Sequence, residues 1–504
     1  MATDNIQGTG AAGTTGVGGG NGSTGFTGTT TTAVSTTVGA GGGFTGTTTN
    51  TTTTETPVGV DAGADAMDDA SMVNCEGLDQ SKPVVLYLSP DDSNSMGSPV
   101  HARERLNVGK APQSIRTYEF LNYYHIQYPA PLPGKLALFA ESEPAQTMGE
   151  YNLQLAVRSF DATKPRRPIT VTFVLDTSGS MAGPGMEREV AAVKAIAKSL
   201  ASGDIVNVVT WNTDNQVLLS GHPVTGPNDV KLLQVANGLT ASGGTDLHGG
   251  LVAGYQLAQA HYGEGRLNRL VLISDGGANV GVVDEDLIAL HSEDADKEGI
   301  YLVGVGTGPE APYNDMLMDV VTDKGRGAYV YLDTPAEADK MFVDRFDETM
   351  EVAARGVQIE LTMPWYFSIS KFSGEEFSTD PTEIEPQHLA PSDAVVLNQV
   401  LKACDPAVVN NADPIKLRVT WQTPITYENK ETLMETTLGD LLAAAKPTLP
   451  KGHAIVAYAE ALKSQNPQEL KDALAKIQAA NMAGTDPELN EIATLIAKHP
   501  AYTP

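Results

Sequence analysis

An apolar segment that ends in small polar residues constrains the fold of this chain more than any other feature. Residues 171–175 read Val-Thr-Phe-Val-Leu, and residues 176–180 read Asp-Thr-Ser-Gly-Ser. A short apolar run rich in β-branched residues is typical of a strand that is buried on both faces of a parallel sheet. Apolar residues at helical spacing follow over residues 190–200. Strand, polar loop and helix predict the first unit of a doubly wound α/β domain, in which ligands bind at the carboxyl ends of the strands.

The polar loop carries the donor atoms of a divalent-cation site. Asp176, Ser178 and Ser180 place one carboxylate and two hydroxyls at alternating positions. Such an oxygen-only set suits hard cations such as Mg²⁺. Two later segments offer more oxygen: Thr245 stands just before a predicted helix, and Asp275 follows a second apolar strand. Because parallel strands end at the same edge of a sheet, we expect these five side chains to meet there.

In their order and context, these five residues resemble the metal-ion-dependent adhesion site of the von Willebrand factor A (VWA) domain. The resemblance implies that Asp176, Ser178 and Ser180 hold Mg²⁺, with Mn²⁺ or Ca²⁺ as alternatives. It also implies that Thr245 binds in a ligand-occupied state and that Asp275 acts directly or through water. An open position on the cation would accept an Asp or Glu carboxylate of a protein or surface-polymer partner. The alternative is a cation that only stabilises the loop.

The resemblance extends beyond the α/β domain. Residues 114–131, 274–281 and 306–318 are similar to segments of a bacterial family of secreted or lipid-anchored VWA proteins. Two features depart from that family. The sequence starts without a signal segment, and Gly277 stands where the family's residue is commonly acidic. In this fold, movement of Thr245 is expected to couple to the last helix of the domain.

The periodicity of apolar residues predicts the wider organisation. Strands that alternate with helices over residues 168–354 predict a largely parallel sheet covered on both faces. Apolar and polar residues alternate on both sides of this region, for example at residues 153–157 and 357–363, which indicates half-buried antiparallel strands. We therefore expect an α/β fold in which a Rossmann-like doubly wound VWA domain is inserted in a β-sandwich, with C-terminal helices and a disordered N-terminal tail.

The expected divisions are a Thr- and Gly-rich tether (1–80), the first part of the sandwich (81–165), the VWA domain (166–355), the second part of the sandwich (356–430) and a helical region (431–504). Within the VWA domain, the pattern predicts further strands at 205–211, 269–274, 301–305 and 328–332, and helices at 229–239, 246–261, 284–299, 313–323 and 335–354.

The start of the chain has too little apolar content to bury a core. Residues 1–56 contain 21 Thr and 15 Gly, and no Lys or Arg precedes Lys82. This composition favours a spacer between a membrane anchor or wall and a folded head, and the alternative is a dispensable tail. The two cysteines, Cys75 and Cys404, leave two possibilities open: a single disulfide or two unrelated thiols.

Charge and motifs exclude several functions. A net charge of −29 repels nucleic acid phosphates and anionic lipid headgroups. No apolar run approaches the ~20 residues that span a bilayer, and the first residues lack the basic and apolar regions of a secretory signal. The sequence contains neither a Gly-x-Ser-x-Gly nor a His-Glu-x-x-His motif, which argues against an enzyme.

The sequence therefore predicts a non-enzymatic protein that binds a partner through a divalent cation. The tether and the flanking sandwich favour the cell envelope or surface, with a possible lipid anchor in a precursor. Two alternatives remain open. One is a cytoplasmic VWA protein that assists an ATP-driven assembly or chaperone machine, which the start without a signal favours. The other is a structural scaffold with an incidental metal.

Overall fold

The computed structural model of the chain describes residues 75–91, 94–276, 299–308 and 313–503. Residues 284–298 of the predicted helix at 284–299, and the departure at Gly277, lie outside the described residues. Contacts divide the chain into residues 1–60 and residues 61–504, and all described elements belong to the second unit.

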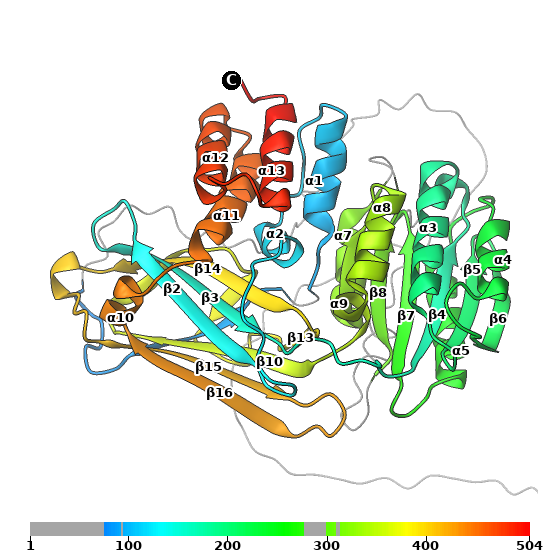
Figure 1. Cartoon of the computed structure of the whole chain (residues 1–504), viewed down its shortest axis with the longest axis horizontal. Helices are drawn as coiled ribbons and strands as arrows, with labels where there is room; N and C mark the ends of the chain where they lie inside the picture. The colour runs from blue at the N-terminus through cyan, green and yellow to red at the C-terminus, as the bar shows by residue number, and fades with distance from the viewer. Residues whose placement is uncertain (1–74, 92–93, 277–298, 309–312, 504) are drawn as a thin grey trace, which may run out of the picture. The chain divides into compact units, whose positions relative to one another are not determined.

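A six-stranded sheet with the order β6-β5-β4-β7-β8-β9 forms the centre of the α/β domain (Figure 1). Its strands are β4 (Ile169–Asp176), β5 (Ile205–Trp211), β6 (Asn215–Pro223), β7 (Leu267–Ser274), β8 (Tyr301–Gly306) and β9 (Arg326–Tyr331). All neighbours are parallel except β5 and β6. The edge strand β6 was not predicted, because a largely exposed strand needs no continuous apolar pattern. The predicted fold class is confirmed.

Helices cover both faces of this sheet. They are α3 (Pro184–Ser199), α4 (Val230–Gly238), α5 (Leu247–Ala260), α7 (Asp315–Gly325), α8 (Pro335–Asp339), a π-helical segment (Lys340–Asp344) and α9 (Phe346–Met350). Successive side chains of β4 point to opposite faces, so Phe173 packs in one core with Val193 of α3, and Val174 packs in another with Leu251 of α5. Strand β4 is buried along its whole length.

The prediction of one closing helix over residues 335–354 is wrong. The segment is divided into α8, the π-helical segment and α9, and a strand begins at Ala354. The amide of Arg345 donates to the Lys340 carbonyl (2.9 Å), five residues back, which is the π-helical spacing. The buried Arg345 guanidinium donates to the Tyr123 carbonyl (3.0 Å) from a distant part of the chain. We attribute the break to this tertiary contact, which the local pattern of the helix does not contain.

Two antiparallel sheets form a β-sandwich. The first contains β1 (Val84–Ser89), β10 (Ala354–Met363), β12 (Glu376–Ser378), β13 (Gln387–Leu389), β15 (Pro414–Gln422) and β16 (Asn429–Thr437), and the second contains β2 (Ala137–Pro144), β3 (Glu150–Arg158), β11 (Phe367–Phe372) and β14 (Ala394–Ala403). Strand β1 pairs with β10, and β3 pairs with β14, so each sheet combines strands from before and after the α/β domain. The alternating residues Leu155 and Ile359 meet in the shared core.

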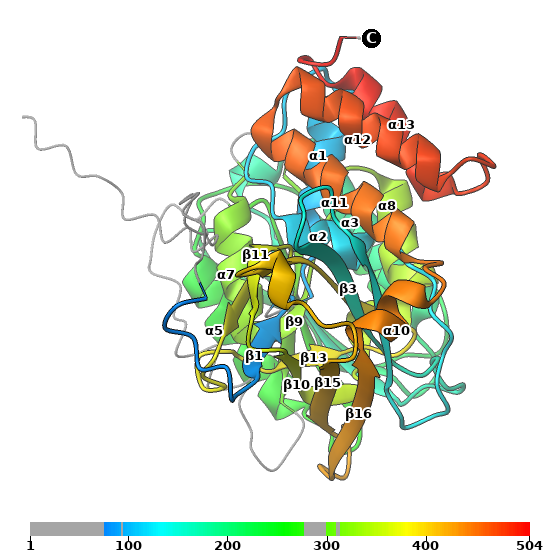
Figure 2. The same cartoon turned by 90° about the vertical axis from the view of Figure 1, so that its left-hand side faces the viewer.

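A group of helices lies beside the sandwich and the α/β domain (Figure 2). It consists of α1 (Gly97–Asn107), α2 (Thr117–Tyr123), α11 (Leu449–Ser464), α12 (Pro467–Ala480) and α13 (Pro487–Lys498), whereas α10 (Leu438–Ala443) packs on strands β2 and β16 of the sandwich. Helix α1 contacts both α13 and β9, whereas α2 contacts α11 and β14. Within the described ranges, no helix combines the length and the apolar character needed to cross a membrane.

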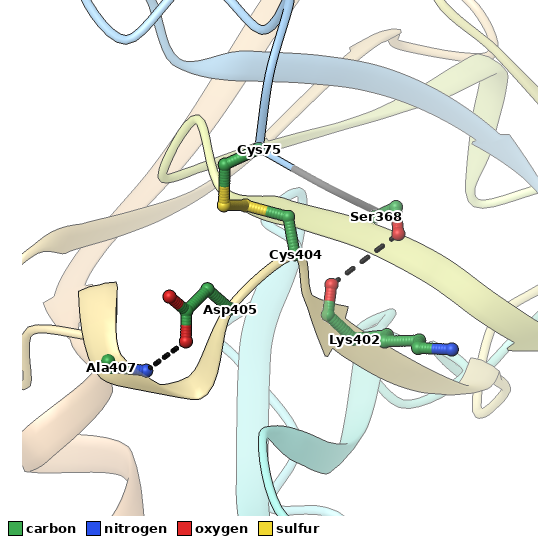
Figure 3. Close-up of a disulfide and its surroundings, with 6 residues drawn as sticks. All are labelled: Cys75, Ser368, Lys402, Cys404, Asp405 and Ala407. Carbon is green, nitrogen blue, oxygen red and sulfur yellow. Dashed lines mark hydrogen bonds between the residues drawn. A yellow bond between two sulfur atoms is a disulfide. The ribbon is translucent and has the colours of Figure 1, made fainter. Parts of the chain in front are cut away.

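Cys75 and Cys404 form a disulfide (Figure 3). The bond joins the segment before β1 to the end of β14, across a sequence separation of 329 residues. Of the two possibilities that the sequence left open, the structure therefore shows the disulfide, and it uses both cysteines of the chain.

Arg103 on α1 lies at the centre of a buried ion-pair cluster that joins α1 to the end of the α/β domain. Its guanidinium donates to Asp333 (2.6 and 2.8 Å) and to Glu337 of α8 (2.7 Å), whose side chains are 3% and 4% exposed. It also donates to the Tyr123 hydroxyl (2.9 Å) and to Glu491 of α13 (3.2 Å). One guanidinium thus connects α1, α8 and α13.

Replacing Arg103 with methionine should lower the free energy of unfolding by about 3–5 kcal/mol, because two buried carboxylates would lose their cation. Chemical denaturation of the full chain measures this change. Lys198→Met is the matched control, since Lys198 pairs with Asp339 on the surface (side chains 44% and 51% exposed) and should cost about 1 kcal/mol or less. Equal losses in both variants would contradict the importance of the buried cluster.

Candidate functional site

The Asp176 side chain lies at the carboxyl end of β4 and is sealed from solvent (0% exposed). Its Oδ1 accepts a hydrogen bond from the Ser178 amide (2.9 Å), and its Oδ2 accepts one from the Ser274 hydroxyl (2.7 Å) at the end of β7. Because β4 and β7 are parallel neighbours, their ends meet at this point. The carboxylate is therefore held in one orientation by one donor from the loop after β4 and one from the end of β7.

The two serines of the loop lie next to each other. The Ser178 and Ser180 hydroxyl oxygens are 3.0 Å apart, and a short 3₁₀ turn (Gly179–Met181) follows Ser178. Ser178 is buried, whereas Ser180 is exposed. The pair therefore leads from the buried carboxylate of Asp176 to the surface.

The loop that contains Thr245 is attached to the Asp176 loop by backbone hydrogen bonds. The Ser242 amide donates to the Thr177 carbonyl (2.7 Å), and the Gly179 amide donates to the Gly243 carbonyl (3.2 Å). Gly243 has a positive φ of 83°, which favours glycine at this contact. Thr245 itself is 8% exposed, directly before the start of α5. Backbone hydrogen bonds thus bring the loop that carries Thr245 against the Asp176 loop.

Asp275 follows β7 and is also buried (0% exposed). Its carbonyl accepts from the Asn314 amide (3.2 Å), which fixes the backbone at the end of the strand. The Ser274 hydroxyl that donates to Asp176 also accepts from the Gly276 amide (3.0 Å). The segment after β7 therefore forms the third side of the candidate site.

The electrostatics of the site are those of closely spaced acids. Burial raises the pKa of the Asp176 carboxyl to about 6, hydrogen bonds from Ser178 and Ser274 oppose this rise, and the charge of Asp275 adds to it. Glu189 of α3 is a further buried acid near Asp176, and burial raises its pKa well above the ordinary value. Placing a dication beside these carboxyl groups would favour their charged forms.

The structure brings together the segments that carry all five predicted residues. It also adds Ser274 and Glu189, which the sequence analysis did not select. The sequence did contain features that could have identified both residues. Ser274 is a hydroxyl residue at the end of an otherwise apolar strand, and Glu189 stands four residues before Val193 on the apolar stripe of α3. In the part of the chain that the structure describes, no three His, Cys, Asp or Glu side chains are placed to share an ion. A cation here would therefore depend on the hydroxyl groups as well as the carboxylates.

Replacing Ser274 with alanine should lower the free energy of unfolding by about 1–3 kcal/mol in the presence of EDTA, because the buried Asp176 carboxylate would lose a donor. Ser220→Ala is a suitable control, since its hydroxyl contacts His261 (2.9 Å) at an exposed position and should change stability by no more than about 0.5 kcal/mol. Urea denaturation gives both values, and an unchanged Ser274→Ala would contradict the orienting role of Ser274.

Part of the α/β domain is similar in sequence to known proteins. The sequence profile of the von Willebrand factor type A domain matches residues 171–278. The Escherichia coli (strain K12) protein YfbK is 28% identical over 284 residues, which cover 53% of this chain and 49% of YfbK. The Homo sapiens inter-alpha-trypsin inhibitor heavy chain H6 is 22% identical over 240 residues, which cover 46% of this chain and 17% of that protein. The chain thus spans about half or less of the length of these relatives.

Among solved structures, the von Willebrand factor type A protein from Catenulispora acidiphila has a TM-score of 0.45 and 14% sequence identity, with 73% of this chain and 90% of that chain covered. The profile match covers β4, the Asp176 loop and the end of β7, which are the elements that build the candidate site. Residues 171–278 are therefore similar to the von Willebrand factor type A domain in sequence, and the α/β fold around them is of the same type.

Proposed function

We propose that this chain binds a partner through a divalent cation held at the carboxyl edge of the β4–β9 sheet. Asp176, Ser178, Ser180, Thr245 and Asp275 would hold the cation, and an Asp or Glu carboxylate of a protein or surface polymer would complete its coordination. The observation that carries this proposal is Asp176, a fully buried carboxylate that donors from the loop after β4 and from the end of β7 hold beside a second buried acid. Binding to other proteins is the general activity of VWA domains.

The donor chemistry of these residues fits a hard cation. Two carboxylates and three hydroxyls offer only oxygen, which Mg²⁺ prefers, and Mn²⁺ or Ca²⁺ would also accept this set. When bound, the cation would supply a position to which a carboxylate oxygen can coordinate. Asp176 and Asp275 would supply negative charge from the buried side of the site. Ser180, which is exposed, would lie on the side that a partner can reach.

Because the chain has a large net negative charge, a bound cation would help it to bind an acidic partner. A protein with a net charge of −29 repels an acidic partner over long distances. A bound dication would reverse the local sign of the field at one point, so that a partner carboxylate is attracted there and nowhere else on the surface nearby. Recognition would then depend on the metal rather than on a large apolar contact.

The disulfide supports a location at the cell envelope or surface. Disulfides persist in oxidising compartments and are rare in the cytoplasm. The bond between Cys75 and Cys404 therefore favours the surface proposal over a cytoplasmic partner of an ATP-driven machine. A lipid anchor in a precursor would be consistent with this location.

The contacts of α1 support coupling between the site and α8. Arg103 binds Glu337 of α8, and the next residue, Glu104, pairs with Arg188 of α3, the helix that follows the Asp176 loop. Movement of either helix would therefore have to break or carry along contacts with α1. We propose that partner binding shifts α8 through these contacts.

Asp176→Asn should weaken Mg²⁺ binding by more than about 100-fold, since loss of a direct ligand costs more than the 10–100-fold typical of supporting groups. Isothermal titration calorimetry on the full chain measures this affinity. Asp214→Asn, an exposed acid in the β5–β6 turn, is the matched control and should bind like the wild type. Partner captured from envelope extracts should be released by EDTA, and capture that persists in excess chelator would refute the metal bridge.

In intact cells, Cys75 and Cys404 should resist alkylation by a membrane-permeant thiol reagent until a reductant is added, because an oxidising compartment keeps the disulfide closed. Mass spectrometry of the alkylated protein measures the result. Cys75→Ser is the control, since its remaining thiol at Cys404 should be alkylated without reductant. Complete alkylation of both wild-type cysteines would favour the cytoplasmic alternative.

A further inference from the structure

Glu189 is a buried acid whose side chain has no hydrogen-bond partner. It lies on the inner face of α3, is 0% exposed, and neither Oε1 nor Oε2 reaches a donor. Its nearest apolar neighbours along the same helix face, Ala192 and Val193, belong to the core. Burying an unpartnered carboxyl group costs several kcal/mol, so packing of the core alone does not account for an acid at this position.

The charges that act on Glu189 come from the candidate metal site. Burial is the largest cause that raises the pKa of Glu189, the charges of Asp176 and Asp275 add to this rise, and a contact with the Asp176 backbone partly opposes it. Arg188, the adjacent residue, is directed elsewhere: its guanidinium donates to the carbonyls of Thr307 (3.2 Å) and Gly308 (3.1 Å) and pairs with a glutamate of α1. Glu189 is thus placed against two other acids.

Protonation of Glu189 would remove its charge but would not supply the hydrogen-bond partners that it lacks. A protonated carboxyl group has one O–H donor and further acceptor capacity, and neither oxygen has a partner in the protein. A hydrated dication would supply what is missing: positive charge and water molecules that donate hydrogen bonds. Mg²⁺ usually retains several waters when it binds to proteins.

We propose that Glu189 is a third acid of the metal site, which acts from outside the set of direct ligands by accepting hydrogen bonds from the hydration shell of the cation and by supporting Asp176. The proposal rests on the metal-dependent function proposed above. Glu189 is a positioning residue and not a ligand, because no three acids among the described residues are placed to share an ion.

This role changes the charge balance of the site. Asp176, Asp275 and Glu189 together offer three negative charges to a cation that carries two. The cation would therefore be held firmly before a partner arrives, and it would stay with this chain when the partner leaves. The cation itself would still attract a partner carboxylate at its open position, and the third acid would weaken this attraction, which predicts reversible binding to the partner rather than a permanent bridge.

The test compares Mg²⁺ affinity of the full chain in the wild type, Glu189→Gln and Glu187→Gln. Glu187 lies on the same helix but is exposed, so its variant is the matched control. Loss of an outer carboxylate should weaken Mg²⁺ binding about 10–100-fold in Glu189→Gln, whereas Glu187→Gln should stay within about twofold of the wild type. Isothermal titration calorimetry with Mg²⁺ alone gives these values, and Mn²⁺ serves as a second probe.

A second readout separates metal binding from folding. In EDTA, Glu189→Gln should unfold at a temperature no lower than the wild type, because a buried amide costs less than a buried unpartnered acid. Glu189→Met, which fills a similar volume with apolar atoms, should show the same loss of Mg²⁺ affinity and replaces the Gln variant if that one does not fold. Failure of both variants to fold would assign Glu189 to the core and overturn the proposal.

The experiment distinguishes failure of the role proposed for Glu189 from failure of the proposed metal-dependent function. If the wild type binds Mg²⁺ and Glu189→Gln binds it equally well, the role of Glu189 is refuted while the proposed function stands. If the wild type binds neither Mg²⁺ nor Mn²⁺, the metal-dependent function fails and the role of Glu189 fails with it.

Discussion

The candidate site depends on keeping one carboxylate in place where β4 ends. Asp176 is fully buried, and its two oxygens are fixed by the Ser178 amide and the Ser274 hydroxyl. Strand β4 can carry an acid to this depth because both of its faces are covered, by α3 on one side and α5 on the other. Because burying this carboxylate in its charged form is unfavourable, a cation bound beside it would be favoured.

Much of this arrangement follows from local sequence. The abrupt change from apolar residues to Asp-Thr-Ser-Gly-Ser marks the end of β4, and the topology of a parallel sheet brings the later loops to the same edge. The sandwich strands are equally visible, because apolar residues such as Leu155 and Ile359 recur at every second position and meet in one core, while β1 pairs with β10 and β3 pairs with β14.

The features that the sequence did not predict are those that tertiary contacts create. Helix α1 has a polar sequence because Arg103 and Glu104 are buried in ion pairs rather than exposed to water. The closing helix is interrupted where Arg345 reaches the Tyr123 carbonyl, more than two hundred residues away in the chain. Glu189 falls on the apolar stripe of α3, but an acid at such a position does not by itself indicate a role, and only the packing of α3 beside the Asp176 loop places it near the candidate site.

The adjacent residues Arg103 and Glu104 have a consequence for the evolution and engineering of this protein. One binds Asp333 and Glu337, and the other binds Arg188, so α1 neutralises charges at two separate places on the α/β domain. A fragment that begins near residue 166 would lack both partners and would carry unmatched charges on a surface that is normally covered. The α/β domain is therefore not an independent unit, and moving it to another protein would require α1 to be moved with it.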